Sequence, residues 1–138
     1  DPAVLCLAPG EWLVCSERME FSQLSRPLKA ALDTRLTTVL DFSAGLTVLR
    51  LEGSGVPWLL NKLCPLDVQG GMNRGSHCAR TRLQQAGVVL HCRESSGPAS
   101  TRVFDLIVDR SLARYTRDLL IASIPHAEEL NRSFGNRL

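Results

Sequence analysis

Short apolar runs separated by turn residues open this chain and predict a β-hairpin. The runs cover residues 4–7 and 12–15, and they flank the sequence Ala8-Pro9-Gly10-Glu11. Pro presets its φ angle and Gly accepts a positive φ, so a Pro-Gly pair between two apolar runs is a turn signal. We therefore expect the chain to begin with two antiparallel strands.

The pattern then changes to a helical period. Leucines recur every fourth residue from 24 to 36, which places them on one face of a helix. Ser25 can cap the N-terminus of this helix, and Pro27 is tolerated in its first turn because the missing N–H would have no intrahelical partner there. The β-branched run 37–39 favours a strand over residues 37–42. A turn at Gly45 then leads to a second predicted strand, residues 46–51, with apolar residues on both faces.

The middle of the chain is predicted to hold two helices and a long irregular stretch. Residues 56–63 form a short helix with Pro57 in its first turn. Residues 65–76 contain one Pro, one Asn and three Gly residues, and this composition favours a loop. Residues 77–86 are expected to be helical, with Gly87 as the C-terminal cap.

The last third predicts a hairpin followed by helices. Residues 87–92 and 102–108 are expected strands, joined by a polar loop. Apolar residues within 110–123 then recur at helical spacing, and Pro125 is expected to break or kink the helix. Residues 126–134 are expected to continue as a second helix.

Together these elements predict an α+β fold: an antiparallel sheet of about six strands, built from β-hairpins, with three to four helices packed on it. The order helix-then-hairpin occurs in residues 22–52 and again in residues 76–108, which raises the hypothesis of an αββ pseudo-repeat, although the two units share few identities. The length of 138 residues fits a single domain, 1–138. Because the chain starts at Asp1 without Met, we expect a processed form or a part of a longer protein.

The composition is that of a globular protein, and the cysteine count bears on the cellular compartment. The apolar fraction is 44% and the charged fraction is 22%, which is typical of a chain with a buried core. No apolar run approaches the ~20 residues that cross a bilayer, so no membrane span is expected. The odd count of five cysteines and the lack of a signal-peptide pattern favour an intracellular protein, cytoplasmic or nuclear, with secretion as the alternative.

The cysteines are expected to be thiols rather than metal ligands. Zinc modules usually carry their ligands in close pairs such as C-x₂-C, and this spacing is absent. His91 and Cys92 are neighbours on a predicted strand, so they face opposite sides and do not readily reach one ion. Buried thiols are the favoured interpretation, with a disulfide between Cys6 and Cys15 as an alternative. We predict no metal and no cofactor.

Positive charge is concentrated in the second half of the chain. Residues 71–138 hold ten Arg and no Lys, against six acidic residues. Arg110, Arg114 and Arg117 follow i, i+4, i+7 spacing, which places them on one stripe of a helix. Tyr115 lies beside this stripe, and Trp58 is a second candidate partner contact because Trp is a frequent interface anchor.

A second candidate site is an anion site at the start of the predicted helix 77–86. The glycines of Gly70-Gly-Met-Asn-Arg-Gly-Ser76 resemble those of a phosphate loop in spacing, but the required Lys and Ser/Thr are displaced. Gly75 and Ser76 would offer N–H groups to an anion, with Arg80 and Arg82 supplying charge.

No pattern of catalytic residues identifies a reaction, so we predict that the chain is not an enzyme. The sequence favours a non-catalytic protein–protein interaction or assembly domain of a larger protein or complex, with a protein partner. The alternative is binding of nucleic acid or a phosphoanion through the Arg-bearing helix. Steep weakening by salt would distinguish phosphate contacts from a protein interface.

Overall fold

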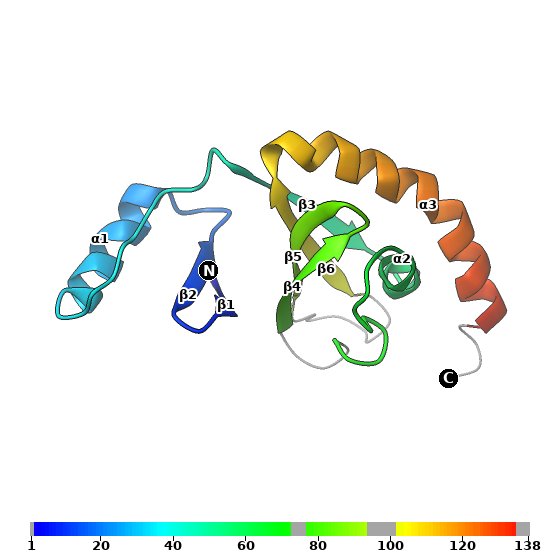
Figure 1. Ribbon diagram of the computed structural model, residues 1–138, viewed down its shortest axis with the longest axis horizontal. Coiled ribbons are helices and arrows are strands. Elements are labelled where there is room, and N and C mark those ends of the chain that lie inside the picture. The colour runs from blue at the N-terminus through cyan, green and yellow to red at the C-terminus, as the bar shows by residue number, and fades with distance from the viewer. Residues whose placement is uncertain (1, 73–76, 94–101, 135–138) are drawn as a thin grey trace. The chain divides into compact units, whose positions relative to one another are not determined.

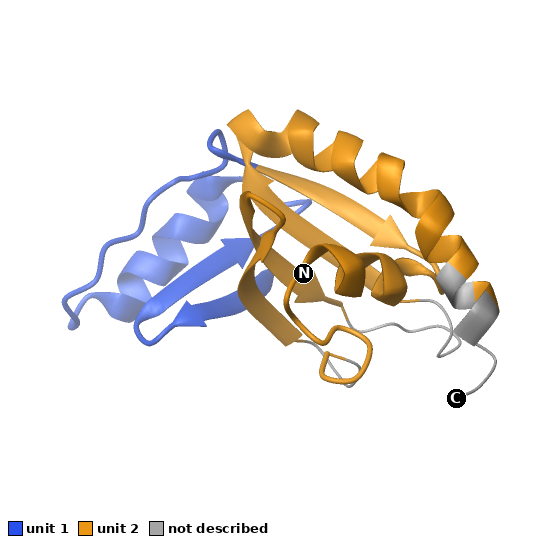
Figure 2. Ribbon diagram, turned by 45° about the vertical axis from the view of Figure 1, so that its right-hand side comes forward, with its two compact units in different colours: residues 1–46 blue, residues 47–138 orange. Residues whose placement is uncertain are grey.

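A computed structural model describes residues 2–72, 77–93 and 102–134 of the chain. The chain divides into two compact units, residues 1–46 and residues 47–138 (Figure 2). The strands form two sheets, one of two strands and one of four. The predicted α+β class is confirmed, with the correction that the strands are shared between two sheets.

The first unit consists of a hairpin and a helix. β1 (Ala3–Ala8) pairs antiparallel with β2 (Glu11–Cys15), which confirms the predicted hairpin, and Gly10 in the turn has a φ of +79°. The helix α1 spans Phe21–Leu32 and therefore begins before the predicted cap. Its N-terminus is fixed by reciprocal hydrogen bonds between Glu20 and Gln23, a capping box that takes the place expected for Ser25.

The second unit holds the larger sheet, whose strands lie in the order β3-β6-β5-β4. β5 pairs antiparallel with both β4 and β6, and β3 forms the edge beside β6. The elements, in chain order, are β3 (Leu46–Glu52), α2 (Val56–Leu63), β4 (His77–Leu83), β5 (Ala86–Cys92), β6 (Val103–Asp109), the 3₁₀ helix η1 (Arg110–Leu112) and α3 (Ala113–Phe134) (Figure 1).

The core of this unit lies between one face of the sheet and the helices α2 and α3. Phe104, Leu106 and Val108 alternate along β6, and all three are almost fully buried. In a pleated strand these alternate positions share one face, which here packs against the core, and Asp105 and Ile107 on the opposite face are also buried. From the helices, Leu60 and Leu120 complete the same apolar cluster.

The irregular stretch after α2 is anchored to this core rather than loosely held. The side-chain oxygen Oδ1 of Asn61 accepts a hydrogen bond of 2.7 Å from the N–H of Val68, and Oδ1 of Asp67 accepts one of 2.8 Å from Gly70. Val68 and Met72 are buried in the core cluster. The predicted loop is therefore confirmed over residues 65–72, and residues 73–76 lie outside the described part of the chain.

The predicted helix over residues 77–86 is wrong, because this stretch forms β4 and the start of β5. Ala79 and Leu83 pack on the core, whereas Arg80 and Arg82 are exposed, so the stretch has the period of two that belongs to a strand. Gln84 turns the chain with a φ of +54°. Without this helix the second αββ unit does not exist, and the pseudo-repeat hypothesis is wrong as well.

The predicted strand over residues 37–42 is also absent, since these residues form neither a helix nor a strand. They run as an open chain from the end of α1 towards β3 (Figure 1). The β-branched composition is present, but a strand also requires a neighbouring strand to pair with. Within the described residues this segment has no such neighbour.

The predicted break at Pro125 does not divide the last helix. α3 continues from Ala113 to Phe134 with Pro125 inside it. Proline removes one helical hydrogen bond, and the packing of Ser123 and Ala127 in the buried face continues across this position. Among the residues that the structure describes, no helix has the length and apolar character needed to cross a membrane.

An ion cluster lies on the face of the sheet opposite the core. The carboxylate of Asp105 on β6 accepts hydrogen bonds from Arg50 Nε at 2.8 Å and Arg50 Nη2 at 3.1 Å, and from Arg93 Nη1 at 3.0 Å. Burial, the largest single influence, opposes ionisation of Asp105, but the hydrogen bonds from the two guanidinium groups together outweigh it and lower its pKa. The cluster therefore joins β3, β6 and the end of β5 through side chains.

We expect Leu60→Ala to lower the free energy of unfolding by about 2–5 kcal/mol, because it leaves a cavity in a fully buried part of the core. The matched variant Leu36→Ala removes the same atoms from a fully exposed position and is expected to change stability by less than about 0.5 kcal/mol. Denaturant unfolding of both variants measures the difference. Equal effects would contradict the assigned core.

Asp105→Asn is expected to destabilise the protein by about 2 kcal/mol, since two guanidinium groups lose their carboxylate and both are partly exposed to water. The control is Asp118→Asn, which removes an exposed carboxylate next to Arg114 and Arg117 and should cost less than about 0.5 kcal/mol. Because the pKa of Asp105 is lowered, its contribution is present at neutral pH and is lost as the pH falls through the lowered pKa. Urea unfolding at pH values near 7 and near 3 tests both statements.

His91 is expected to make the protein less stable in mild acid. Burial lowers the pKa of His91, although Asp105 nearby acts in the opposite direction. Below about pH 6.5 the unfolded chain therefore binds a proton that the folded chain resists, so stability falls as the pH drops through this range. Unfolding free energies between about pH 7.5 and about pH 5.5 should show this slope in the wild type and a smaller slope in His91→Gln. Identical slopes would contradict the buried neutral imidazole.

Candidate functional site

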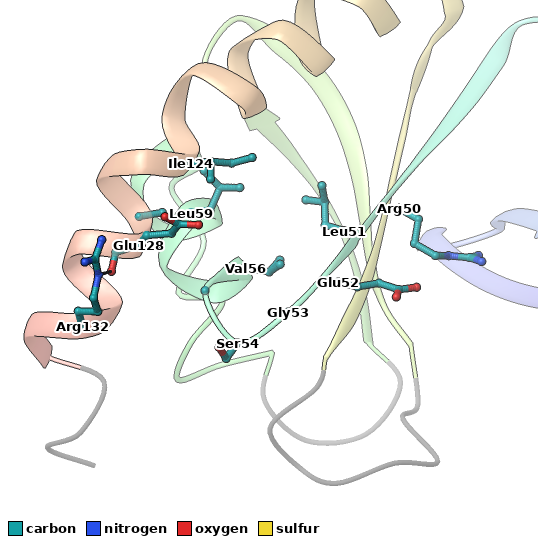
Figure 3. A pocket seen from close by; sticks show the side chains of 12 residues that line it. Arg50, Leu51, Glu52, Gly53, Ser54, Val56, Leu59, Ile124, Glu128 and Arg132 are labelled. Atoms are coloured by element: carbon teal, nitrogen blue, oxygen red, sulfur yellow. Dashed lines mark hydrogen bonds between the residues drawn. The ribbon is translucent and has the colours of Figure 1, made fainter.

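The second unit has a groove of about 640 Å³ where β3 meets the N-terminus of α2 and the last turns of α3 (Figure 3). Leu51, Val56 and Leu59 form an apolar side of this groove. Ile124 and Ala127 of α3 line the other side. The groove therefore offers an apolar floor made by the consecutive elements β3 and α2 together with α3, which is far from them in the sequence.

Charged side chains of both signs lie on the α3 side of this floor, where Glu128 and Arg132 stand one turn apart. The side chains of Arg50 and Glu52 point to the other side of β3 from Leu51, away from the floor (Figure 3). Arg132 Nε donates to the main-chain oxygen of Glu128 at 3.4 Å, and the guanidinium of Arg50 is bound to Asp105. Because the rim carries charges of both signs, it does not select an anion. The groove suits an apolar group whose polar neighbours are neutral or carry both signs of charge.

The predicted Arg stripe is exposed but is partly neutralised. The side chains of Arg114 and Arg117 on α3 are 91% and 64% exposed, and both lie within ion-pair distance of Asp118, at 3.8 and 3.5 Å. Arg110 is also exposed but belongs to η1, so the three arginines do not share one regular α-helix. The structure thus brings two of the three cations together around one carboxylate.

Two aromatic residues were predicted as partner contacts, and they lie in different settings. Tyr115 on α3 is 43% exposed, which leaves its ring accessible to a partner. Trp58 on α2 is half-buried and packs against the core, so part of its surface already serves the fold. Neither position tests the predicted contact, which stays a prediction.

The predicted anion site loses its helix N-terminus, because residues 77–83 form β4. Gly75 and Ser76 lie outside the described residues. Arg80 and Arg82 are exposed on β4 and occupy the same face of that strand. Anion binding by these two arginines remains a prediction without the expected helix.

All five cysteines are thiols. Cys6 lies opposite Trp12 and Cys15 lies opposite Ala3, so the alternative of a disulfide across the first hairpin is wrong. Cys64 and Cys92 are buried, and burial raises the pKa of both thiols, which makes them poor nucleophiles. In the described ranges, no group of three or more His, Cys, Asp or Glu side chains is placed to hold a metal ion.

Sequence reasoning missed the exposed apolar surface of the first unit. Trp12 is 61% exposed, and Leu40 is 74% exposed. Among the described residues of this unit, Leu5 alone is a buried hydrophobic residue. The available signal was the small size of the unit, since a hairpin and one helix rarely bury a core of their own. The exposed large apolar side chains of this unit are Val4, Trp12, Met19, Leu36, Leu40 and Phe42.

No protein-family model matches this chain. Its sequence is similar to the protein named sarcosine oxidase subunit gamma from three bacteria. The identity is 42% over 66 residues with Corynebacterium sp. strain P-1, covering 48% of this chain and 32% of that protein. It is 41% over 75 residues with Corynebacterium sp. strain U-96 and likewise with Arthrobacter sp., covering 52% of this chain and 36% of each protein. The matches thus span about a third of the length of these curated relatives.

A solved structure shares the fold. One chain of the heterotetrameric sarcosine oxidase from Corynebacterium sp. U-96, in complex with pyrrole 2-carboxylate, matches with a TM-score of 0.76 and 28% identity. The match covers 91% of this chain and 60% of that chain. In sequence and in fold, the chain is therefore homologous to a subunit of a heteromeric complex.

Proposed function

We propose that this chain has an assembly role in a heteromeric oxidase of the sarcosine oxidase kind, where it binds other subunits. The observation that carries the proposal is the agreement of two similarities, one in sequence to gamma subunits and one in fold to a chain of a heterotetramer. The substrate of such a complex, in this proposal, is sarcosine or a related secondary amine.

The surface chemistry of the chain supports a role in assembly. Large apolar side chains of the first unit, including Trp12 and Leu40, are exposed to water. On α3, Tyr115, Ile121 and Ile124 are also exposed. Aromatic and aliphatic side chains that lie on the surface of one chain commonly become the buried centre of a protein interface.

Nucleic-acid binding through Arg110, Arg114 and Arg117 is the alternative. Asp118 pairs with two of these arginines and reduces the positive charge that the stripe presents. No comparison concerns nucleic acid, so the alternative rests on the exposure of these side chains alone.

The test is purification of the tagged full-length protein from its own cells at ~0.15 M and ~0.5 M salt, with and without nuclease. We expect a fixed set of polypeptides in constant ratio by native mass spectrometry, retained at the higher salt because an apolar interface is weakly screened. The purified complex is expected to oxidise sarcosine.

Two outcomes would overturn the assembly role. Recovery of the protein alone at both salt concentrations would show that it has no stable partner. Recovery with nucleic acid, or with partners that are lost after nuclease treatment or at ~0.5 M salt, would favour the Arg-bearing helix instead.

A further inference from the structure

Residues 36–42, here called the open segment, have the composition of a strand without the structure of one. Val39, Phe42 and two threonines are residue types enriched in β-strands. In the structure the open segment is neither helix nor strand. In the described part of the chain, no main-chain hydrogen bond reaches residues 36–41. The local preference of the sequence is therefore left unsatisfied in the chain by itself.

Three of the four even positions of the open segment are apolar, namely Leu36, Leu40 and Phe42, and the fourth is Thr38. On the odd positions, Thr37 and Asp41 flank Val39. In an extended chain the even positions share one face. All three of these apolar side chains are exposed, and Leu36 is fully so. An apolar strand face is present without anything to cover it.

The open segment is bounded at both ends by turns that belong to this chain. Before it, the N–H of Arg35 bonds to the oxygen of Leu32 at the end of α1. After it, Oδ1 of Asp41 accepts a hydrogen bond of 2.9 Å from the N–H of Ser43, and Gly45 N–H bonds to the oxygen of Phe42. The segment between these turns has the length of an ordinary short strand.

We propose that the open segment adds as a strand to the edge of a β-sheet in a partner subunit, an inference that rests on the proposed assembly role. Only a sheet edge supplies N–H and C=O groups in register along the whole segment. A helix or a loop surface would cover the apolar side chains but would leave the main chain unpaired. The partner edge must also continue into an apolar surface that receives Leu36 and Leu40. The similar solved structure is a heterotetramer, so it is an example of a complex in which a subunit contacts polypeptides different from itself.

The test is a proline scan of residues 37–40 in the full chain within the purified complex. Along a strand at a sheet edge, successive N–H groups point alternately towards the neighbouring strand and away from it, and Pro removes the N–H. We expect two alternate positions, either Thr37 and Val39 or Thr38 and Leu40, to weaken complex formation about tenfold, with a smaller effect at the other two. Hydrogen exchange should show the same alternation, with two of the four amides protected only in the complex.

The controls separate pairing from unfolding. Thr37→Ser keeps the N–H and is expected to leave the complex intact. The isolated proline variants should melt at the wild-type temperature, because the segment is unpaired in the isolated chain. Leu40→Ser should weaken the complex through the lost apolar contact.

Three results would overturn the proposal. Equal losses at all four positions, or no loss at any of them, would exclude strand pairing while leaving the assembly role intact. Unprotected amides throughout the segment in the complex would do the same. Failure of the wild-type chain to form any complex would remove the assembly role and the strand addition together.

Discussion

The burial of one face of the four-stranded sheet beneath α2 and α3 is the constraint on which the rest of this chain depends. Phe104, Leu106 and Val108 face the helices and are almost fully buried. The loop after α2 is held in place because the side chains of Val68 and Met72 are buried in the same apolar layer. The groove lies where this layer reaches the edge strand β3, so its apolar floor is a margin of the core. Among its described residues, the first unit buries only one large apolar side chain, Leu5, and leaves six others exposed.

Local signals in the sequence correctly predict the first hairpin and the start of α2. Pro9-Gly10 between two apolar runs predicted the first hairpin, and the early Pro57 predicted the start of α2. Local signals do not predict the elements whose structure depends on packing against the core or on pairing with another strand. The period of two in β4 is hard to see in the sequence because Ala79 is small and Thr81 is polar, and it becomes clear only when Ala79 and Leu83 are seen against the core. Residues 37–42 of the open segment are predicted as a strand because β-propensity is a local property, whereas strand pairing depends on distant residues.

The candidate sites show the same division. The exposed positions of Arg114 and Arg117 were predictable from helical spacing. The groove was not predictable, since Leu51, Leu59 and Ile124 come from three elements and no sequence pattern links them. The proposed role in a particular kind of complex rests on the similarity to gamma subunits of sarcosine oxidase, which the sequence patterns alone do not indicate.

The exposed apolar residues of the first unit affect how readily copies of the chain aggregate. With a net charge of only +2, two copies of the chain repel each other weakly. Exposed Trp12 and Leu40, together with an unpaired strand-prone segment, are features that promote aggregation. Under the proposed assembly role, the chain stays dispersed best when its partners are made in matching amounts, so the relative rates of subunit synthesis bear directly on its aggregation.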